Sequence, residues 1–399
     1  MLLVNTLFYF NMTNIFKTEC VKKHKKYRAK VMRVTTPHGE FLTPTFMPVG
    51  TKAMVNCLSV TQLQQAKSQI ILGGNTYHMQ LRPGLEVLKQ VGGMHNFMSW
   101  QQPMLTDSGG FQVLSLAKNA KLCIIDDNGA KFKSPYDGKV LRLTPASSIQ
   151  AQKIIGADII MAFDQCTPNV NNRKIAEQSL ERTHRWLQIC KEEHDKHPNA
   201  ITGMKQALFG IIQGGIFKDL RRESAKFVLS LGLDGVAIGG ETIGFDIPKT
   251  QEILQDLTNI IAQDQLLYTM GVGLNPQNLI DVVKYGADIF DCVAPTRNAR
   301  HGSLYNGEVK IVDNWVQFIK HNPEGRILIK KAEYATDNQA ISKNCDCSTC
   351  AKYSRAYLHY LFRNSLSLYY ELACAHNIRM MHKTCELMRQ CILERDFLL

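Results

Sequence analysis

Four polar residues each stand directly after a short apolar run of the sequence: Asp107, Asp164, Gln213 and Asp291. Carboxylates can carry protons or attack an electrophilic carbon, and an amide can donate and accept hydrogen bonds. Two cations, Arg297 and Arg300, follow Asp291 after a proline. Cations close behind a carboxylate suit chemistry on an anionic substrate. These residues are the candidates for catalysis and binding.

Each of these aspartates also has a simpler interpretation. An aspartate at the end of a strand often caps the next helix, and arginines such as Arg297 and Arg300 often lie on the surface. Several such residues beside glycine-rich turns, for example Gly239-Gly240, are harder to explain as caps, because such turns let a ligand approach the backbone. The pattern therefore favours one shared site.

A second cluster lies near the C-terminus. Cys345, Cys347 and Cys350 fall within six residues, and His376 follows Cys350 by 26 positions. Three closely spaced thiolates with a distant imidazole are typical of a closed, structural zinc site. His359 and His382 are alternative fourth ligands, although His359 lies too near the cysteines to fold back easily.

Alternating strands and helices must position these residues. Eight apolar runs end in Gly, Asn, Asp or Gln and are predicted strands: Phe46–Val49, Ile70–Leu72, Met104–Thr106, Ile159–Phe163, Leu208–Ile212, Gly235–Ile238, Leu266–Met270 and Asp288–Phe290. Helical periodicity occupies gaps between them: Thr144–Ile155, Ala176–Cys190, Leu220–Leu231, Ile247–Ala262 and Pro276–Tyr285. The alternation predicts an α/β protein, a (β/α)8 TIM barrel, with function at the C-terminal ends of its strands. A doubly wound open sheet is the alternative, weakened by the absence of a G-x-G-x-x-G turn opening a helix.

The remaining segments complete the predicted organisation. Residues 122–144 hold the turn pairs Asn128-Gly129 and Asp137-Gly138, which predict a small antiparallel β insertion. We expect residues 1–16 to be an extension outside the fold, with Met12 an alternative start. Residues 17–335 would form the barrel domain, and residues 336–399 a helical zinc-binding subdomain.

Composition narrows the class of protein. The chain carries 47 Lys and Arg against 35 Asp and Glu, a formal charge of +12, which favours a polyanionic partner, nucleic acid above all. Its 12 cysteines are mostly scattered, which indicates a reducing, cytoplasmic environment rather than a disulfide framework. The apolar N-terminus lacks a basic region and a cleavage site, so we expect no signal peptide. No stretch approaches the roughly 20 apolar residues of a membrane span.

Several motifs follow one another along the chain: Thr106-Asp-Ser-Gly-Gly-Phe-Gln112, Phe163-Asp-Gln-Cys-Thr-Pro168, Gly210-Ile-Ile-Gln-Gly214, Phe290-Asp-Cys-Val-Ala-Pro-Thr-Arg297 and the Cys345/Cys347/Cys350/His376 spacing. In this order they resemble the tRNA-guanine transglycosylases over roughly residues 28–395. The chain looks like the bacterial homodimeric type, because it lacks the extra RNA-binding domains of the archaeal type.

The resemblance implies a base exchange on tRNA in queuosine biosynthesis. The wobble guanine of a U-G-U anticodon, in the aspartate, asparagine, histidine and tyrosine tRNAs, is replaced by a 7-deazaguanine. Asp291 matches the family's nucleophile, which captures the ribose covalently, and Asp107 its general acid/base. The two carboxylates need different environments for these roles.

The resemblance also assigns recognition residues. Phe111 and Met270 match positions that sandwich the flipped-out purine, although ordinary core packing would explain them equally well. Asp164 would accept hydrogen bonds from the guanine N1–H and exocyclic amine, while the Gln213 side chain and the Gly240 N–H donate to O6. Arg297 and Arg300 would read the flanking uridines, and other basic residues would hold phosphates. One structural Zn²⁺ is implied at the cysteine cluster.

Departures from the family pattern concern the incoming base. Glu241 stands in place of a leucine, Phe245 in place of a carboxylate, and Gln165 in place of a glutamate. These positions surround the 7-substituent, so the base could be 7-aminomethyl-7-deazaguanine, the bacterial default, or queuine. A non-catalytic tRNA-binding partner subunit is an alternative function, disfavoured because Asp107 and Asp291 are both present. A glycosidase acting on free nucleosides is disfavoured by the basic balance.

An aromatic series on the helix after the cysteines bears on assembly. Tyr353, Tyr357 and Tyr360 match a dimer-contact region of the family. Their spacing is also that of a stripe facing the core of the subdomain. We therefore expect a homodimer and keep the core stripe as the alternative.

Overall fold

Eight parallel strands form the centre of the molecule. The computed structural model describes residues 14–119, 121–168 and 171–394. The central sheet has the strand order β4-β14-β13-β12-β11-β10-β6-β5. Its strands are β4 (Thr45–Pro48), β5 (Ile71–Asn75), β6 (Met104–Asp107), β10 (Ile159–Met161), β11 (Ala207–Ile212), β12 (Gly235–Ile238), β13 (Leu267–Thr269) and β14 (Ile289–Cys292). Each overlaps one predicted apolar run.

The sheet curls so that its first and last strands meet. Val49 forms a parallel bridge with Leu72, and the Gly50 N–H donates to the Leu72 carbonyl at 2.7 Å. These contacts join β4 to β5 and nearly close the barrel, which confirms the predicted (β/α)8 architecture. The open doubly wound alternative is wrong, because an open sheet would leave both edge strands unpaired.

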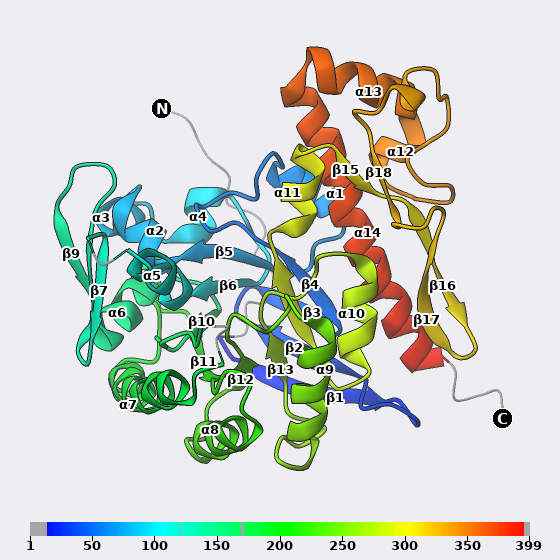
Figure 1. Ribbon diagram of the computed structural model, residues 1–399. Coiled ribbons are helices and arrows are strands. Elements are labelled where there is room, and N and C mark those ends of the chain that lie inside the picture. Colours follow the sequence, from blue (N-terminus) through cyan, green and yellow to red (C-terminus); the bar gives the residue numbers. More distant parts are fainter. Residues whose placement is uncertain (1–13, 120, 169–170, 395–399) are drawn as a thin grey trace.

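Helices cover the outside of the barrel (Figure 1). They are α1 (Val60–Gln65), α2 (Thr76–Leu81), α3 (Leu85–Gln90), α4 (Met94–Met98), α5 (Gly110–Ala117), α6 (Pro145–Ile155), α7 (Arg173–Lys196), α8 (Lys218–Ser230), α9 (Ile247–Asp256) with η1 (Leu257–Asn259), α10 (Pro276–Val283) and α11 (Ala294–Arg300). Helix α6 begins as its sequence predicts: Thr144 is the N-cap in a capping box and Pro145 is the first helical residue.

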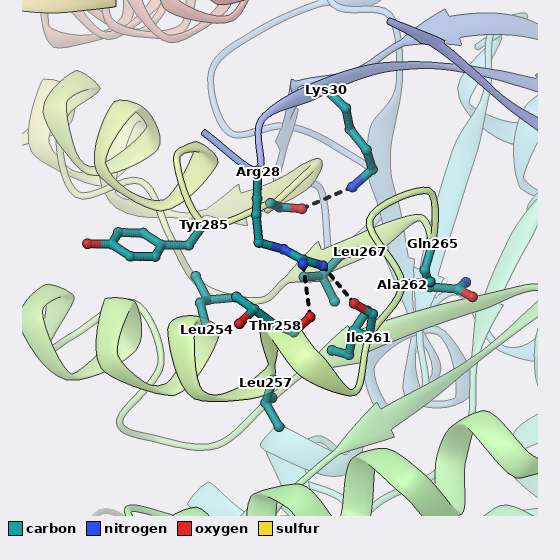
Figure 2. A pocket seen from close by; sticks show the side chains of 11 residues that line it. Arg28, Lys30, Leu254, Leu257, Thr258, Ile261, Ala262, Gln265, Leu267 and Tyr285 are labelled. Carbon is teal, nitrogen blue, oxygen red and sulfur yellow. Dashed lines mark hydrogen bonds between the residues drawn. The ribbon is translucent and has the colours of Figure 1, made fainter. Parts of the chain in front are cut away.

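An antiparallel sheet that was not predicted covers the N-terminal end of the barrel. It consists of β1 (Lys17–Lys23), β2 (Lys30–Thr36) and β3 (Gly39–Leu42). Figure 2 shows Arg28 donating to the carbonyls of Thr258 (2.8 Å) and Ile261 (2.6 Å), just beyond helix α9. Nearby, Lys30 forms a buried ion pair with Asp288 at 2.7 Å. These two cations fasten the sheet to the start of β14 and the end of α9.

Part of the predicted N-terminal extension lies within the described residues. Residues 1–13 lie outside them. Asn14 accepts from the Lys205 N–H at 2.6 Å and donates to the Gly203 carbonyl at 3.1 Å. The ring of Phe16 packs edge-on against Phe209 of the barrel core, with centroids 6.1 Å apart. The end of that segment therefore contacts the barrel.

The predicted β insertion is present as a three-stranded antiparallel sheet. Its strands are β7 (Cys123–Asp126), β8 (Gly129–Lys133) and β9 (Val140–Leu143). The Phe132 ring packs on Tyr77 of α2, with centroids 4.9 Å apart. The carboxylate of Asp127, in the β7–β8 turn, accepts from Arg182 and Arg185 of α7. The insertion therefore rests on barrel helices.

The chain after α11 builds a separate layer on one side of the barrel, opposite the β7–β9 sheet (Figure 1). Its elements are β15 (Ser303–Tyr305), β16 (Gly307–Val312), β17 (Trp315–Lys320), β18 (Arg326–Leu328), η2 (Ala332–Tyr334), α12 (Ser348–Lys352), α13 (Arg355–Asn364) and α14 (Leu366–Glu394). Helix α14 packs along α10, α11 and β4. The Arg379 side chain, 2% exposed, pairs with Asp346 at 2.6 Å and Glu386 at 2.7 Å. No helix of the described residues has the length and apolar character needed to span a bilayer.

Candidate active site and metal cluster

A pocket of about 360 Å³ opens at the C-terminal ends of the barrel strands. All three predicted strand-end aspartates line it: Asp107 at the end of β6, Asp164 after β10 and Asp291 in β14. Gln213, at the end of β11, lines it too. The expectation that these side chains meet is confirmed, because parallel strands of a closed barrel end at one mouth.

Asp291 is held on one oxygen only. Its Oδ1 accepts from the Tyr268 hydroxyl (2.7 Å) and from the Gly271 N–H (2.9 Å). No other described residue donates to its Oδ2. Burial raises the pKa of Asp291, while the Gly271 and Tyr268 hydrogen bonds oppose that rise. The two donors orient the carboxylate and leave one oxygen for a reaction partner.

Asp107 is buried beside a second carboxylate. Its Oδ2 accepts from the Asn75 amide at 2.7 Å, and Asn75 pairs with Asp107 in the register of β5 and β6. Burial, with the nearby Asp291 charge as the second cause, raises the pKa of Asp107 to about 6. A carboxyl group with that pKa can both give and take a proton near neutral pH.

Asp164 and Gln213 form a joined pair on the pocket floor. The Gln213 Nε2 donates to Asp164 Oδ2 at 2.7 Å, and its Oε1 accepts from the Thr167 N–H at 3.2 Å. Burial raises the pKa of Asp164 to about 7, against the Gln213 hydrogen bond and with a smaller contribution from Asp107. A Cβ on Gly110 would collide with the Asp164 carboxylate, so only glycine lets helix α5 begin so close.

The other predicted contacts lie around this floor. Phe111, 45% exposed, and Met270 both line the pocket, as does Gly240. No described residue accepts a hydrogen bond from the Gly240 N–H. Arg297 lines the pocket from α11, whereas Arg300 does not; its Nε donates to the Thr296 carbonyl at 3.3 Å.

The residues that depart from the family pattern lie at the rim. Glu241 lines the pocket and pairs with Lys118 at 2.8 Å. Phe245 also lines it, with 79% of its surface exposed. Gln165 faces away, where its Oε1 accepts from Arg182 at 2.5 Å. Two of the three departures therefore face the pocket.

Sequence reasoning missed Asn75 and Tyr268. Asn75 ends β5, so the rule that picked the other strand-end residues could have found it. Tyr268 lies inside β13 and is fully buried, apart from a hydroxyl that reaches Asp291. No local signal distinguishes it from a core aromatic.

The cysteine cluster is assembled as predicted. The Sγ atoms of Cys345, Cys347 and Cys350 lie 3.6, 3.5 and 3.3 Å from His376 Nδ1. Tetrahedral zinc with ordinary Zn–S and Zn–N bonds would separate those atoms by about 3.6 Å. His376 Nε2 lies 2.8 Å from the Tyr305 carbonyl, which leaves Nδ1 for a metal. The four residues can therefore hold a metal ion.

The alternative histidines are engaged elsewhere. His359 Nδ1 lies 2.7 Å from the Ile329 carbonyl, and His382 Nε2 lies 2.8 Å from the Ser68 hydroxyl. Neither belongs to the group around the three sulfurs. Of the three candidates, the structure brings only His376 to the cysteines.

Comparisons with known proteins identify the family. The family model described as Queuine tRNA-ribosyltransferase matches residues 25–398. A queuine tRNA-ribosyltransferase of Herpetosiphon aurantiacus is 43% identical over 93% of this chain and 88% of its own length. Those of Staphylococcus haemolyticus and Acetivibrio thermocellus are 43% and 42% identical, each over 94% of this chain and over 92% and 93% of their own lengths. The chain therefore belongs to the queuine tRNA-ribosyltransferase family, the tRNA-guanine transglycosylases.

Proposed function

We propose that this enzyme exchanges the wobble guanine of tRNAs with a U-G-U anticodon for a 7-deazaguanine base. The observation that carries the proposal is the set of three aspartates, Asp107, Asp164 and Asp291, around one pocket with different hydrogen-bond partners. Cleaving and re-forming a glycosidic bond needs a nucleophile and a proton carrier, which two differently tuned carboxylates supply.

Asp291 is the proposed nucleophile. Its Oδ2 attacks C1′ of the ribose, the C1′–N9 bond breaks, and guanine leaves with the bonding electron pair. Asp107 donates a proton to the departing base, and its carboxylate then accepts one from the incoming base. Attack of the incoming nitrogen on C1′ releases Asp291 and re-forms the glycosidic bond, and the RNA backbone stays intact throughout.

The pocket floor is the proposed guanine reader. Asp164 accepts from N1–H and the exocyclic amine, and the second amide proton of Gln213 together with the Gly240 N–H is directed to O6. Phe111 and Met270 stack on the two faces of the purine. A base without that donor and acceptor pattern would offer no donors to the buried Asp164 carboxylate, so discrimination should be strong.

The proposed RNA-contacting residues come shortly after the nucleophile in the sequence. Helix α11 begins two residues after β14 and carries Arg297 and Arg300, the proposed readers of the flanking uridines. Arg297 already lines the pocket, which supports its part of the assignment. Seating the anticodon loop and placing the reactive ribose would then depend on one segment.

The cysteine cluster is the proposed site of one structural zinc ion. Its closed set of four protein ligands leaves no position for a substrate, so it would tie α12 to α14 without taking part in the reaction. Metal analysis of the purified protein should find one zinc per chain, and Cys350→Ser should lose it. Full zinc content in that variant would contradict the assignment.

A homodimer is the proposed assembly. Tyr353, just after α12, stacks on Tyr357 of α13, and Tyr357 stacks on Tyr360, with ring centroids 5.4 and 6.5 Å apart. Tyr357 is 39% exposed and Tyr360 58% exposed. Exposed stacked aromatics are typical of an interface, so Tyr357 and Tyr360 argue against the core stripe, whereas Tyr353 packs partly against the core. Light scattering of wild type and Tyr360→Glu tests this, because a charge at that position should favour the monomer.

Exchange of radiolabelled guanine into an anticodon stem-loop tests the function. We expect incorporation into a U-G-U loop and none into a loop with another wobble base. A chase with 7-aminomethyl-7-deazaguanine or queuine then identifies the incoming base, and equal use of both would rule out a switched preference. Binding of the stem-loop without any exchange would favour the non-catalytic partner subunit instead.

A further inference from the structure

A buried guanidinium lies beneath the Gly239-Gly240 turn that forms one wall of the pocket. Arg221 belongs to α8 and is 1% exposed. Its Nη1 donates to the carbonyls of Ile212 (2.9 Å) and Gly239 (2.7 Å), and its Nε donates to the Gly215 carbonyl at 2.9 Å. One side chain thus joins the ends of β11 and β12, the two strands whose loops carry the proposed O6 donors.

The charge of this guanidinium is not balanced by a carboxylate. Among the described residues, Arg221 forms no ion pair, and its Nη2 is buried without a hydrogen-bond partner. That atom lies 2.9 Å from where a Cβ on Gly240 would stand. Burial lowers the pKa of Arg221 to about 10, so the group is still a cation at neutral pH.

Burying an uncompensated cation is unfavourable for folding. The three carbonyls could be satisfied by neutral donors, so hydrogen bonding alone does not account for a guanidinium here. The neighbouring Arg222 illustrates the ordinary arrangement, since it is half-exposed and paired with Asp256. A cation kept at this place should act on something in the pocket.

We propose that Arg221 is a positioning residue for base exchange, fixing the Gly239-Gly240 turn and placing positive charge behind the purine O6. The inference rests on the proposed function and deepens it. When the C1′–N9 bond breaks, its electron pair stays on the purine, and conjugation carries part of the charge to O6. The Gly240 N–H, backed by the Arg221 cation, stabilises that charge while Asp107 supplies the proton. Such stabilisation is strongest in a site that excludes water.

Two substitutions separate charge from hydrogen bonding. Arg221→Lys keeps the charge with three N–H donors, and Arg221→Gln removes the charge and keeps two, so the variants differ by one donor and by the whole charge. We expect kcat for guanine exchange to fall about 100-fold in Arg221→Gln and no more than about tenfold in Arg221→Lys. The KM for the stem-loop should stay within about threefold of wild type in both, because Arg221 does not reach the RNA-contacting rim. Arg222→Gln is the matched control and should keep wild-type kcat.

Single-turnover formation of the covalent enzyme–RNA adduct provides a second readout, since it reports the step in which the purine becomes negative. It should slow in Arg221→Gln in proportion to kcat, and melting temperatures should be recorded for all variants. If Arg221→Gln exchanges guanine like wild type, or if Lys and Gln lose activity equally, the inference is overturned. A parallel loss of kcat and melting temperature, with no recovery in Arg221→Lys, would also overturn it. Absence of exchange in wild type would instead overturn the proposed function, and the inference with it.

Discussion

Asp158, at the N-terminal end of the barrel, and the aspartates of its mouth are all buried, but they differ in their hydrogen-bond partners. At the N-terminal end, Asp158 accepts from the backbone N–H groups of His38 (3.1 Å) and Met104 (2.9 Å). The two imidazoles also reach it, His38 Nδ1 at 2.8 Å and His95 Nε2 at 3.4 Å, with their rings stacked 3.5 Å apart. At the mouth, Asp291 has two donors on one oxygen, and Asp164 has one side-chain donor. Asp107 has one side-chain donor, Asn75, and smaller contributions from the backbone N–H groups of Gly109 and Ser108.

The pKa values follow this difference. Burial by itself would raise the pKa of Asp158, but hydrogen bonds from His38 and His95 outweigh it and hold that pKa well below its usual value. At the mouth burial prevails, so the pKa values of Asp107 and Asp164 rise to about 6 and about 7. A carboxylate whose hydrogen bonds outweigh the effect of burial stays ionised and stabilises the fold. A carboxylate for which burial prevails can exchange a proton near neutral pH. The hydrogen bonds of Asp158 with His38 and His95 therefore stabilise the packing of the N-terminal sheet on the barrel.

The largest effect that this comparison predicts is loss of exchange in Asp291→Ala. Removing the nucleophile removes the covalent route, so the exchange rate should fall by on the order of 10⁴-fold. Guanine exchange and a denaturing gel of the enzyme–RNA adduct measure it. If exchange or the covalent adduct survives the substitution, Asp291 is not the nucleophile. The functional difference between the mouth aspartates and Asp158 would then lose its main support.

A smaller kinetic effect is expected for Asp107→Asn. Losing the proton carrier should reduce adduct formation by about 10²- to 10³-fold. Because Asp107 donates as the protonated acid, the wild-type rate of adduct formation should fall as the pH rises through about 6. Single-turnover rates between pH 5 and 8 test this, and the variant should lack that inflection. The same inflection in the variant would assign the proton to another group.

At the other end of the barrel, Asp158→Asn should affect stability and not chemistry. The substitution leaves donors of His38 and His95 poorly matched, and the free energy of unfolding should fall by about 2–4 kcal/mol. A depressed pKa contributes stability above the unfolded value of about 3.9 and loses it as the pH falls toward the folded value. The difference from wild type in urea unfolding should therefore shrink below about pH 4. A large loss of kcat with unchanged stability would contradict the comparison.

The strand ends were the most predictable part of the site. Asp107, Asp164, Gln213 and Asp291 could be placed at one mouth because apolar runs stop at polar residues and parallel strands end at one face. Asn75 obeys the same rule, but its bond to Asp107 depends on the register between β5 and β6, which no single run reveals. Periodicity locates an element, and only pairing brings its side chains to their partners.

Partners supplied by distant elements could not be predicted from local pattern. Arg221 stands in the charged segment Lys218-Asp-Leu-Arg-Arg-Glu223, where an exposed helix face is the ordinary expectation. Its burial follows from the approach of α8 to the Gly239-Gly240 turn. The N-terminal sheet was missed because Lys17–Lys23 alternates weakly and carries many lysines. That segment becomes a strand by pairing with β2, whose apolar residues cover the barrel core.

The smallest predicted effect concerns a charge pair at the rim of the mouth. Solvent screens the interaction between charges there more strongly than between the buried groups of the floor. Lys118 donates to Glu241 at 2.8 Å and is itself largely exposed, so this pair should contribute little to the fold. Lys118→Ala would release Glu241 from that pair, and a 7-deazaguanine with a protonated amine could then engage the carboxylate. In Lys118→Ala we expect the KM for that 7-deazaguanine to fall at most about fivefold. The KM for guanine, which carries no such amine, should not change. Steady-state exchange of both bases measures the difference, and Lys121→Ala is the control for removing a nearby positive charge. An equal change in KM for guanine would show that Lys118 acts on the shape of the pocket instead. The rim would then affect the exchange of every base, as the floor residues do.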